Sequence, residues 1–345
     1  GRVRDLLLTD LCELYNCPEV LDDLRRLDDA SLAAQLIQGT PMKKDTLEKF
    51  LSPLRHTLPP LPNAFFTRDA TMCVHDRVII SSMAFRVRLA ESLLLKAIFG
   101  HYSEIESAGF YFDGTHPKQS ETQVTIEGGD LLVVRDDLIL IGYSERTTAA
   151  GIDRLMQSIA QQGRARNFIV LEIPQNRATI HLDMIFTLID RDKCVVFPPL
   201  ITGANRCRAI RVDFDSDGGT QIEEYNGLLN ALKSHGLDLQ PIPCGGDDPF
   251  QQEREQWSSG ANFFAFAPGH ILGYKHNHHT LEALQRNGFE ALDAEEIITG
   301  DRGLQPGKPA VVLIDGAELS RGGGGCRCMT MPLNRAPVDW QGATT

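Results

Sequence analysis

The sequence predicts an α/β protein built from one recurring unit, with a small helical layer at its N-terminal end. In each unit, two short apolar strands flank a polar turn and are followed by a helix and a further strand. Copies of this order begin roughly 55 to 80 residues apart, a spacing typical of repeat architectures. Four copies open near Thr71, Leu131, Met184 and Phe263. The repetition predicts a radial or closed arrangement of the units.

The second copy shows this order most clearly. Its strands are expected over 131–134 and 138–143, its helix near 151–161, and its last strand over 168–173. A further strand is expected over 328–333, and no helix follows it. We therefore interpret that strand as half of a fifth unit, whose partner strand would come from before Gly1.

Residues 1–57 have the pattern of short helices. Leucines recur near helical spacing at Leu6, Leu7, Leu8, Leu11 and Leu14. Asp29 with Ala30-Ser31 offers a capping start for a helix over 32–36. The segment Leu58 to Pro62 contains three prolines, which forbid helix and favour an extended connector. The sequence therefore predicts a helical domain over 1–57 and an α/β domain over 58–345.

Composition restricts the classes of function. Apolar residues make up 42% and charged residues 23% of the 345 residues. This is typical of a soluble globular chain, and no apolar run approaches the roughly 20 residues of a membrane helix. A net charge of −12 without a clustered Lys/Arg tract argues against nucleic acid as a partner and favours a small cationic ligand.

The cysteines and the first residues predict the compartment. Eight cysteines without disulfide-type spacing indicate a reducing environment. The first residues contain neither an initiator Met nor an apolar signal segment. We therefore expect a cytoplasmic protein with a shortened start.

The most informative segment is Arg321 to Leu333, in which a glycine run precedes Cys326 and Cys328. A glycine run leaves room for a flat ligand, and a thiolate is a nucleophile. A phosphate-binding loop is disfavoured because no Gly-Lys-Ser/Thr follows and Pro332 opposes the helix that such a loop opens. A flexible linker rarely leads directly into an apolar strand. The segment therefore favours covalent chemistry at Cys328 on a small substrate.

A zinc site is the alternative interpretation of the cysteine pair. Further ligands could come from His270, His276, His278 and His279. The two-residue Cys spacing suits tetrahedral ligation poorly, and the sequence has no second Cys pair. We interpret the histidines as surface residues and expect no metal.

Three other polar islands supply an imidazole and carboxylates. Alternation on a strand would place His181 and Asp183 on one face, which gives an acid/base group beside a cation-binding carboxylate. Glu127 to Asp130 contains a Gly-Gly pair typical of tight turns. Asp69 follows the proline-rich connector. Taken alone, each of the last two would be an ordinary turn or loop.

In their order along the chain, these islands resemble the arginine deiminase family of the guanidine-modifying superfamily. The shared motifs are Pro62-Asn63, Phe66-Thr67-Arg68-Asp69, Ile126 to Asp130, Ser144 to Thr147, His181-Leu182-Asp183 and Arg327 to Leu333. The resemblance implies a five-bladed α/β propeller of ββαβ units, here with its first blade incomplete at the N-terminus. It also implies that residues 1–57 are the added helical module of deiminases of free arginine, and that 58–345 are the catalytic domain. Homo-oligomers are common among such enzymes.

The resemblance implies a role for each site residue. Cys328 would be the nucleophile, His181 and Glu127 would transfer protons, and Asp69 and Asp183 would grip the guanidinium of the substrate. Four further residues would line the pocket, and three of them, Asn63 and the two arginines, would hold the substrate carboxylate. The four are Asn63, Phe66, Arg88 and Arg146. The backbone of Gly322 would lie near the ligand, and no metal or organic cofactor would be needed.

Two departures from the family pattern concern substrate affinity and the pocket wall. Many relatives carry an arginine where this chain has Gly323, and Arg321 or Arg327 would have to compensate for it. The N-terminal segment that in the family contributes a strand and part of the pocket wall does not precede Gly1. The resemblance therefore predicts a weakly active or unstable protein if the molecule begins there.

Elementary chemistry supports these roles. A guanidinium is always protonated, so its carbon is a poor electrophile until carboxylates balance the charge and fix its plane. A free thiol titrates near 8.5, but a bound cation about 4 Å away would favour the thiolate by roughly 3 pKa units at an effective dielectric near 20. Attack by Cys328, with a proton from His181 to the departing ammonia, would leave an amidino thioether that water hydrolyses.

The leading hypothesis is hydrolysis of free L-arginine to L-citrulline and ammonia. The nearest rivals are a sister enzyme that acts on agmatine or methylated arginine and an amidinotransferase. From a different class, the chain could be a non-catalytic propeller that binds arginine or a protein partner. The expected partner in the leading hypothesis is the small-molecule substrate, L-arginine, and neither nucleic acid nor a membrane is expected to bind.

Overall fold

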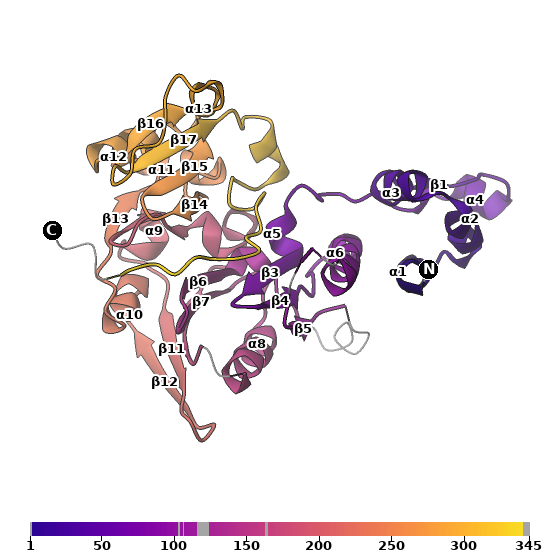
Figure 1. Cartoon of the computed structure of the whole chain (residues 1–345), viewed down its shortest axis with the longest axis horizontal. Helices are drawn as coiled ribbons and strands as arrows, with labels where there is room; N and C mark the ends of the chain where they lie inside the picture. Colours follow the sequence, from indigo (N-terminus) through magenta and orange to yellow (C-terminus); the bar gives the residue numbers. More distant parts are fainter. Residues whose placement is uncertain (1, 103, 106, 116–123, 163–164, 341–345) are drawn as a thin grey trace.

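The computed structural model confirms the α/β class. It describes residues 2–102, 104–105, 107–115, 124–162 and 165–340. Within these residues the strands form separate sheets, and none of the sheets closes on itself. Figure 1 shows the N-terminal helices at one end of the molecule and the sheets of the later units at the other.

The first two units follow the predicted strand order. In the first, β3 (Thr71–Val74) and β4 (Arg77–Ile80) are antiparallel, and β5 (Phe110–Asp113) returns parallel to β4 after α6 (Leu89–His101). In the second, β6 (Leu131–Arg135) and β7 (Leu138–Tyr143) are antiparallel, and β8 (Asn167–Glu172) returns parallel to β7 after α8 (Ala149–Gln161). The predicted strands and helix of the second unit are confirmed to within two residues.

The second sheet also contains a hairpin that the repeat pattern does not predict. The hairpin consists of β11 (Ala209–Phe214) and β12 (Thr220–Tyr225). It interrupts the third unit in sequence, yet β11 pairs antiparallel with β8 and so extends the second sheet to five strands. Backbone hydrogen bonding to an exposed sheet edge explains why a segment of one unit joins the sheet of another.

The third and fourth units repeat the order with one variation. The third consists of β9 (Phe186–Leu188), β10 (Lys193–Val196), α9 (Pro198–Ile201), α10 (Leu228–Ser234) and β13 (Gln240–Pro243). The fourth, which follows α11 (Pro249–Trp257), consists of β14 (Phe264–Ala267), β15 (His270–Tyr274), α12 (His278–Arg286), β16 (Glu290–Asp293), α13 (Ala294–Thr299) and β17 (Ala310–Ile314). In the fourth sheet β17, not β16, pairs with β15.

The strand expected over 328–333 is wrong. Residues 326–329 form a turn, and 330–333 are assigned to no strand. The turn is held by side-chain and backbone hydrogen bonds from neighbouring units, including Arg68 N to the carbonyl of Cys328 at 3.1 Å. In Figure 1 the C-terminal segment passes beside α5 (Thr67–Ala70).

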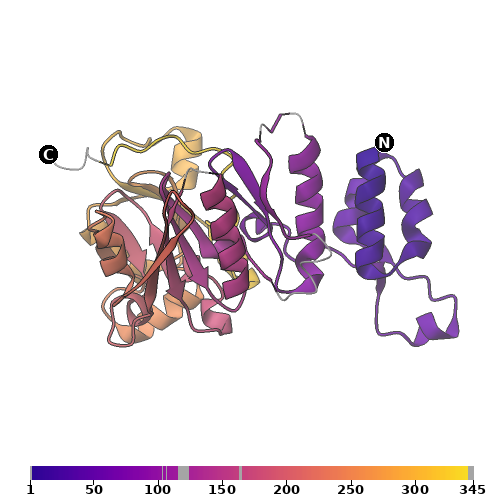
Figure 2. The same cartoon turned by 90° about the horizontal axis from the view of Figure 1, so that it is seen from below.

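The helical layer is confirmed, with a small shift at one cap. It contains α1 (Arg2–Tyr15), η1 (Pro18–Val20), α2 (Leu21–Arg26), α3 (Asp29–Gln38), β1 (Thr40–Pro41), α4 (Leu47–Leu51) and β2 (His56–Leu58). Asp28, rather than Asp29, caps α3 by accepting the N–H of Ser31. Leu8 and Leu11 of α1 share one core with Ala90 and Leu93 of α6, so this layer packs directly on the first unit (Figure 2).

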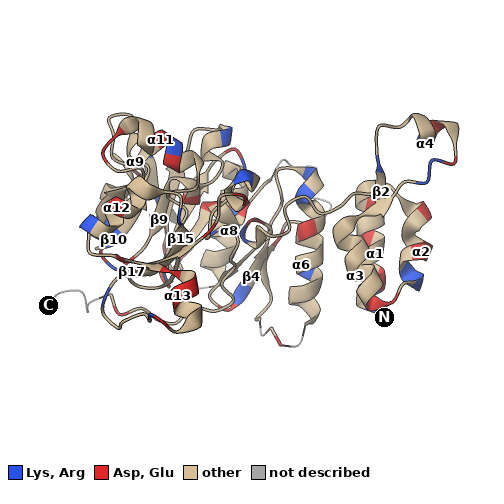
Figure 3. Ribbon diagram, turned by 90° about the horizontal axis from the view of Figure 1, so that it is seen from above, with Lys and Arg blue, Asp and Glu red and all other residues tan. Residues whose placement is uncertain are grey.

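The surface carries mixed charge. Figure 3 shows Lys and Arg interspersed with Asp and Glu over helices of both the helical layer and the α/β region. Among the described helices, none is both long enough and apolar enough for a membrane span.

Candidate active site

The repeat itself brings the candidate residues together. Short turns lie directly ahead of the first strand of three units: α5 before β3, η3 (Gly128–Asp130) before β6, and η5 (Leu182–Met184) before β9. These turns contact one another, and they carry the predicted carboxylates and imidazole. The turn at 326–329 lies against the same group. Equivalent positions in successive units therefore meet at a common site, although they are far apart in sequence.

The imidazole of His181 lies between two carboxylates in a buried position. Its Nε2 is hydrogen-bonded to Oε2 of Glu127 at 2.9 Å, and its Nδ1 lies 3.8 Å from Oδ1 of Asp69. All three side chains are buried. Burial acts to lower the pKa of His181, but Asp69, the Glu127 hydrogen bond and Asp130 outweigh it and raise the pKa to about 10. The imidazole is therefore charged at neutral pH.

Gly129 is required for this placement of the imidazole. A Cβ at Gly129 would lie 2.4 Å from Nδ1 of His181 and 2.5 Å from its Cγ. Any larger residue would displace the ring, so the Gly-Gly pair has a steric reason beyond a tight turn.

Each of the two aspartates has one occupied and one free carboxylate oxygen. Oδ2 of Asp69 accepts from Nη1 of Arg88 at 2.6 Å, and Oδ2 of Asp183 accepts from Nη1 of Arg327 at 2.7 Å. Oδ1 of each aspartate is buried and has no hydrogen-bond partner among the described residues. A buried acceptor without a donor is costly, and each such group calls for an explanation. A ligand that presents N–H donors to both oxygens would remove this cost.

The thiol of Cys328 lies beside this pair of aspartates. Its Sγ is 3.8 Å from Oδ2 of Asp183, and the side chain is buried. Burial, Asp183 and Asp69 together raise its pKa well above the ordinary value for a thiol. In the ligand-free protein the sulfur is therefore protonated at neutral pH, and a cationic ligand would reverse the effect of the aspartates.

Asn262 positions the cysteine and was missed by the sequence analysis. Its Oδ1 accepts the backbone N–H groups of Arg327 at 3.0 Å and Cys328 at 3.2 Å, while its Nδ2 donates to the carbonyl of Asp183 at 3.1 Å. One buried side chain thus ties the turn at 326–329 to the backbone of Asp183. The available signal was positional: Asn262 lies just ahead of β14, where the other units carry their site residues.

Replacement of Asn262 by Leu is expected to lower kcat by roughly 10- to 100-fold, because the thiol loses its fixed position and two backbone donors are left unpaired. The measurements are steady-state turnover of the substrate and the melting temperature. Asn277→Leu is the matched control, since Asn277 is also a buried asparagine and donates to the carbonyl of Ser258. A kcat for Asn262→Leu within twofold of the unmodified chain would contradict the assignment.

Asp130 is a second residue whose role the sequence did not indicate. Its carboxylate accepts from the hydroxyl of Ser144 at 2.6 Å and from the N–H of Leu182 at 2.9 Å. Burial raises its pKa to about 7, against the lowering effect of His181 and of its hydrogen bonds. Its hydrogen bond to Leu182 holds the segment of His181 and Asp183 in place.

The two arginines of the predicted pocket, Arg88 and Arg146, differ in their hydrogen bonds to the protein. Every nitrogen of the Arg88 guanidinium donates to the protein, namely to Asp69, to Glu91 and to the carbonyl of Phe66. The Arg146 guanidinium makes longer contacts with the carboxylates of the described residues, with Nη1 3.7 Å from Oε2 of Glu127. In this structure Arg88 therefore supports Asp69, and its grip on a substrate carboxylate stays a prediction.

The remaining predicted pocket residues surround the glycine run. Asn63 is half-buried and donates its backbone N–H to Glu91. Phe66 is buried, and a Cβ at Gly322 or Gly324 would lie 3.0 Å or less from its ring. The close approach that these two glycines permit is to an aromatic ring of the protein itself. The interpretation that the run also leaves room for a flat ligand stays a prediction.

Gly323 has a different reason to be glycine. Its φ of +90° lies in the left-handed region, and a Cβ there would meet open space. The neighbouring arginines do not replace the missing family side chain: Arg321 pairs with Glu318 on the surface, and Arg327 binds Asp183 and the carbonyl of Leu131.

A metal could in principle use part of this site. One ligand atom each from Asp69, Glu127 and His181 lies within 4.8 Å of the others. The hydrogen bond between His181 and Glu127 and the ion pair between Asp69 and Arg88 already account for this closeness. The cysteines and histidines considered for zinc form no such group in the part of the chain that is described.

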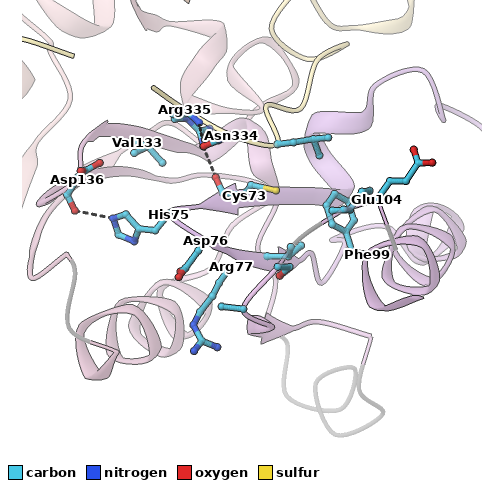
Figure 4. Close-up of a pocket in the computed structure, with 15 residues that line it drawn as sticks. Cys73, His75, Asp76, Arg77, Phe99, Glu104, Val133, Asp136, Asn334 and Arg335 are labelled. Atoms are coloured by element: carbon cyan, nitrogen blue, oxygen red, sulfur yellow. Dashed lines mark hydrogen bonds between the residues drawn. The ribbon is translucent and has the colours of Figure 1, made fainter. Parts of the chain in front are cut away.

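A separate cavity of about 690 Å³ lies at the β3–β4 turn. Figure 4 shows Arg335 hydrogen-bonded to the carbonyl of Cys73, and His75 to that of Asp136, on its wall. None of the residues named above for the thiol site lines it.

Comparison with solved structures first defines the class of protein. The N-terminal domain of ArgZ, solved with a covalently bound reaction intermediate, has a TM-score of 0.52 at 17% identity, over 80% of this chain and 77% of that one. Unliganded AgrE also has a TM-score of 0.52 at 17% identity, over 81% of this chain and 32% of that one. The chain therefore shares its α/β fold with these two proteins.

Sequence comparison then gives the family. The family model for arginine deiminase matches residues 25–335. The arginine deiminase of Lactococcus lactis subsp. cremoris is 34% identical over 282 residues, and that of Oenococcus oeni is 30% identical over 318 residues. The alignments cover 81% and 91% of this chain, but 62% and 69% of those proteins. The chain belongs to the arginine deiminase family, as the motifs indicated.

Proposed function

We propose that this chain hydrolyses free L-arginine to L-citrulline and ammonia through a covalent amidino intermediate on Cys328. The observation that carries the proposal is the pair of buried Oδ1 atoms on Asp69 and Asp183 that have no hydrogen-bond partner among the described residues. The thiol lies 3.8 Å from the other oxygen of Asp183. Two convergent acceptors suit the planar N–H fork of a guanidinium. The similarity to arginine deiminases supports free arginine as the source of that guanidinium.

Binding and attack follow from the charges of the site. The guanidinium donates to Oδ1 of Asp69 and of Asp183, and its positive charge favours loss of the thiol proton of Cys328 to solvent. The thiolate then forms a bond to the central carbon and gives a neutral tetrahedral adduct. His181, which holds a proton at neutral pH, transfers it to one nitrogen, the carbon–nitrogen bond breaks, and ammonia departs.

Hydrolysis of the intermediate uses the same imidazole in the opposite direction. His181, now neutral and held by Glu127, removes a proton from water as the oxygen adds to the amidino carbon. Collapse of this second adduct breaks the carbon–sulfur bond. The proton left on the product and the thiolate of Cys328 recombine into the thiol as citrulline leaves. The net reaction consumes one arginine and one water.

Incubation of the purified chain with L-arginine, followed by assay of citrulline and ammonia, tests the activity. Acid quenching during turnover followed by mass spectrometry should show one amidino group on Cys328. If arginine binds but neither turnover nor an adduct is detected, the chain is a non-catalytic arginine-binding protein and the proposal is wrong.

Replacement of Arg146 by Ala separates arginine from agmatine, which lacks the carboxylate. We expect KM for arginine to rise by roughly 10- to 100-fold, because a charge-assisted hydrogen bond to the carboxylate is lost. Turnover of agmatine should be low in the unmodified chain, and Arg146→Ala should not change it. Efficient agmatine turnover, unimpaired in Arg146→Ala, would instead assign the chain to the agmatine-hydrolysing rival.

We also propose the finer architecture. The units surround the site as blades of a propeller, with the turn at 326–329 as part of a fifth blade. Convergence of equivalent turns from successive units on one site supports this arrangement. Residues 1–57 form a helical domain beside a catalytic domain over 58–345. The free cysteines favour a cytoplasmic location, and homo-oligomers are expected by resemblance to the superfamily.

A further inference from the structure

Arg146 lies at the edge of the site, near two carboxylates with which its guanidinium forms no hydrogen bond. Its Nη1 is 3.7 Å from Glu127 and its Nε is 3.9 Å from Glu145, both beyond hydrogen-bond distance. Its Nε is buried and finds no hydrogen-bond acceptor in the described part of the chain. The strongest contact is aromatic instead: Cζ lies 4.2 Å from the centre of the Phe85 ring. This distance is well within the range of a cation–π interaction.

The backbone fixes Phe85 independently of its side chain. Its carbonyl accepts the N–H of Arg88 at 2.9 Å, and the N–H of the preceding Ala84 donates to Oε1 of Glu127 at 2.9 Å. The ring nevertheless remains 47% exposed. A large apolar side chain on a fixed loop, half in solvent and stacked on a single cation, is better explained by that stacking than by core packing.

We propose that Phe85 is a positioning residue that sets the preference for ligands with a carboxylate. Its ring holds the Arg146 guanidinium, whose Nε has no hydrogen-bond acceptor among the described residues, in a position to grip a carboxylate. Without the ring, Arg146 can move onto Glu127 or Glu145, where its charge is neutralised. The inference rests on the proposed function, since it takes the ligand to carry a guanidinium and a carboxylate.

The backbone of Arg146 is already held, which confines the role of Phe85 to the side chain. Ser144 Oγ accepts the N–H of Arg146 at 3.0 Å and donates to Oδ2 of Asp130 at 2.6 Å. Loss of the Phe85 ring should therefore leave the loop and the buried site intact and change only the direction of the guanidinium.

The test uses the whole chain with Cys328→Ser, so that binding is measured without turnover. Isothermal titration calorimetry gives Kd for L-arginine and for agmatine, with and without Phe85→Leu. We expect Phe85→Leu to raise Kd for arginine by roughly 3- to 10-fold, the range of a partly exposed cation–π contact. Kd for agmatine should stay unchanged, and Phe85→Tyr, which restores an aromatic ring, should recover arginine binding.

Phe266→Leu is the matched control. Phe266 is 44% exposed and its ring is stacked on that of His270, in the fourth sheet. This variant should bind both ligands as the parent does. Equal weakening of arginine and agmatine by Phe85→Leu, or no weakening of either, would overturn the inference and leave the proposed function standing. Failure of the Cys328→Ser chain to bind arginine at all would overturn both.

Discussion

Replacement of Cys328 by Ala is expected to reduce citrulline formation by at least about 10⁴-fold while arginine still binds, because a nucleophile that acts with other groups as a unit accounts for most of the catalysis. The aspartates and the imidazole remain in place in this variant. The measurements are kcat from citrulline release, Kd for arginine by calorimetry, and the mass of the acid-quenched protein, which should show no amidino adduct.

Cys326→Ala is the control for this variant. Cys326 is also buried, two residues away, and burial raises its pKa to about 12. It has no assigned part in the reaction, so Cys326→Ala should keep its turnover. Citrulline formation by Cys328→Ala at a rate near that of the unmodified chain would show that the sulfur does not form the reacting bond.

The second large effect is expected at His181. His181→Gln should lower kcat by roughly 10²- to 10⁴-fold, the range of general acid–base catalysis, because ammonia leaves without a proton and water is not activated. KM for arginine should change much less, since the proposed ligand contacts of Asp69 and Asp183 remain. A kcat of His181→Gln within about tenfold of the parent would contradict the assignment.

The pH dependence of stability gives an independent measure of His181. Its pKa in the folded protein is raised to about 10, above the ordinary value of 6.5. The folded state therefore holds this proton more tightly than the unfolded chain does. The resulting stabilisation is fully present below pH 6.5 and is lost as pH rises toward 10.

The difference in melting temperature between the unmodified chain and His181→Gln isolates this contribution. It should favour the unmodified chain most at pH 6 and decline steadily to pH 10. A difference that grows with pH would mean that His181 is neutral in the folded protein, and it could not then supply a proton to ammonia at neutral pH.

The free site is arranged at a cost to stability. It buries the carboxylates of Asp69 and Asp183 with one oxygen of each unpaired, and it keeps the thiol protonated beside them. These are features that a stable core avoids, and proteins retain them where a ligand will complete the pairing. The internal guanidinium groups of Arg88 and Arg327 offset half of the cost by binding the other oxygens.

Sequence patterns were sufficient for the units and for most of the chemistry. Alternation of apolar strands with polar turns predicted the hairpin that opens each unit, because side-chain period and turn chemistry are local properties. The resemblance to the family proposed Cys328, His181, Glu127, Asp69 and Asp183 because each stands in a short motif, and their roles stay predictions. The strand expected over 328–333 does not form, because hydrogen bonds hold Cys328 in a turn. Arg68 donates its backbone N–H to the carbonyl of Cys328, and Asn262 accepts the backbone N–H of Cys328. Both partners come from distant segments of the chain, so local sequence patterns do not reveal them.

The sequence by itself therefore determined the repeating α/β unit and proposed the candidate reactive groups. Only the tertiary structure decided how those groups are engaged: that Asn262 ties Cys328 to Asp183, that Arg88 supports Asp69, and that Phe85 stacks on Arg146. It also decided that β11 joins the sheet of another unit. The reason is the same in each case, since these contacts join residues that are distant in the chain and depend on the packing of whole units against one another.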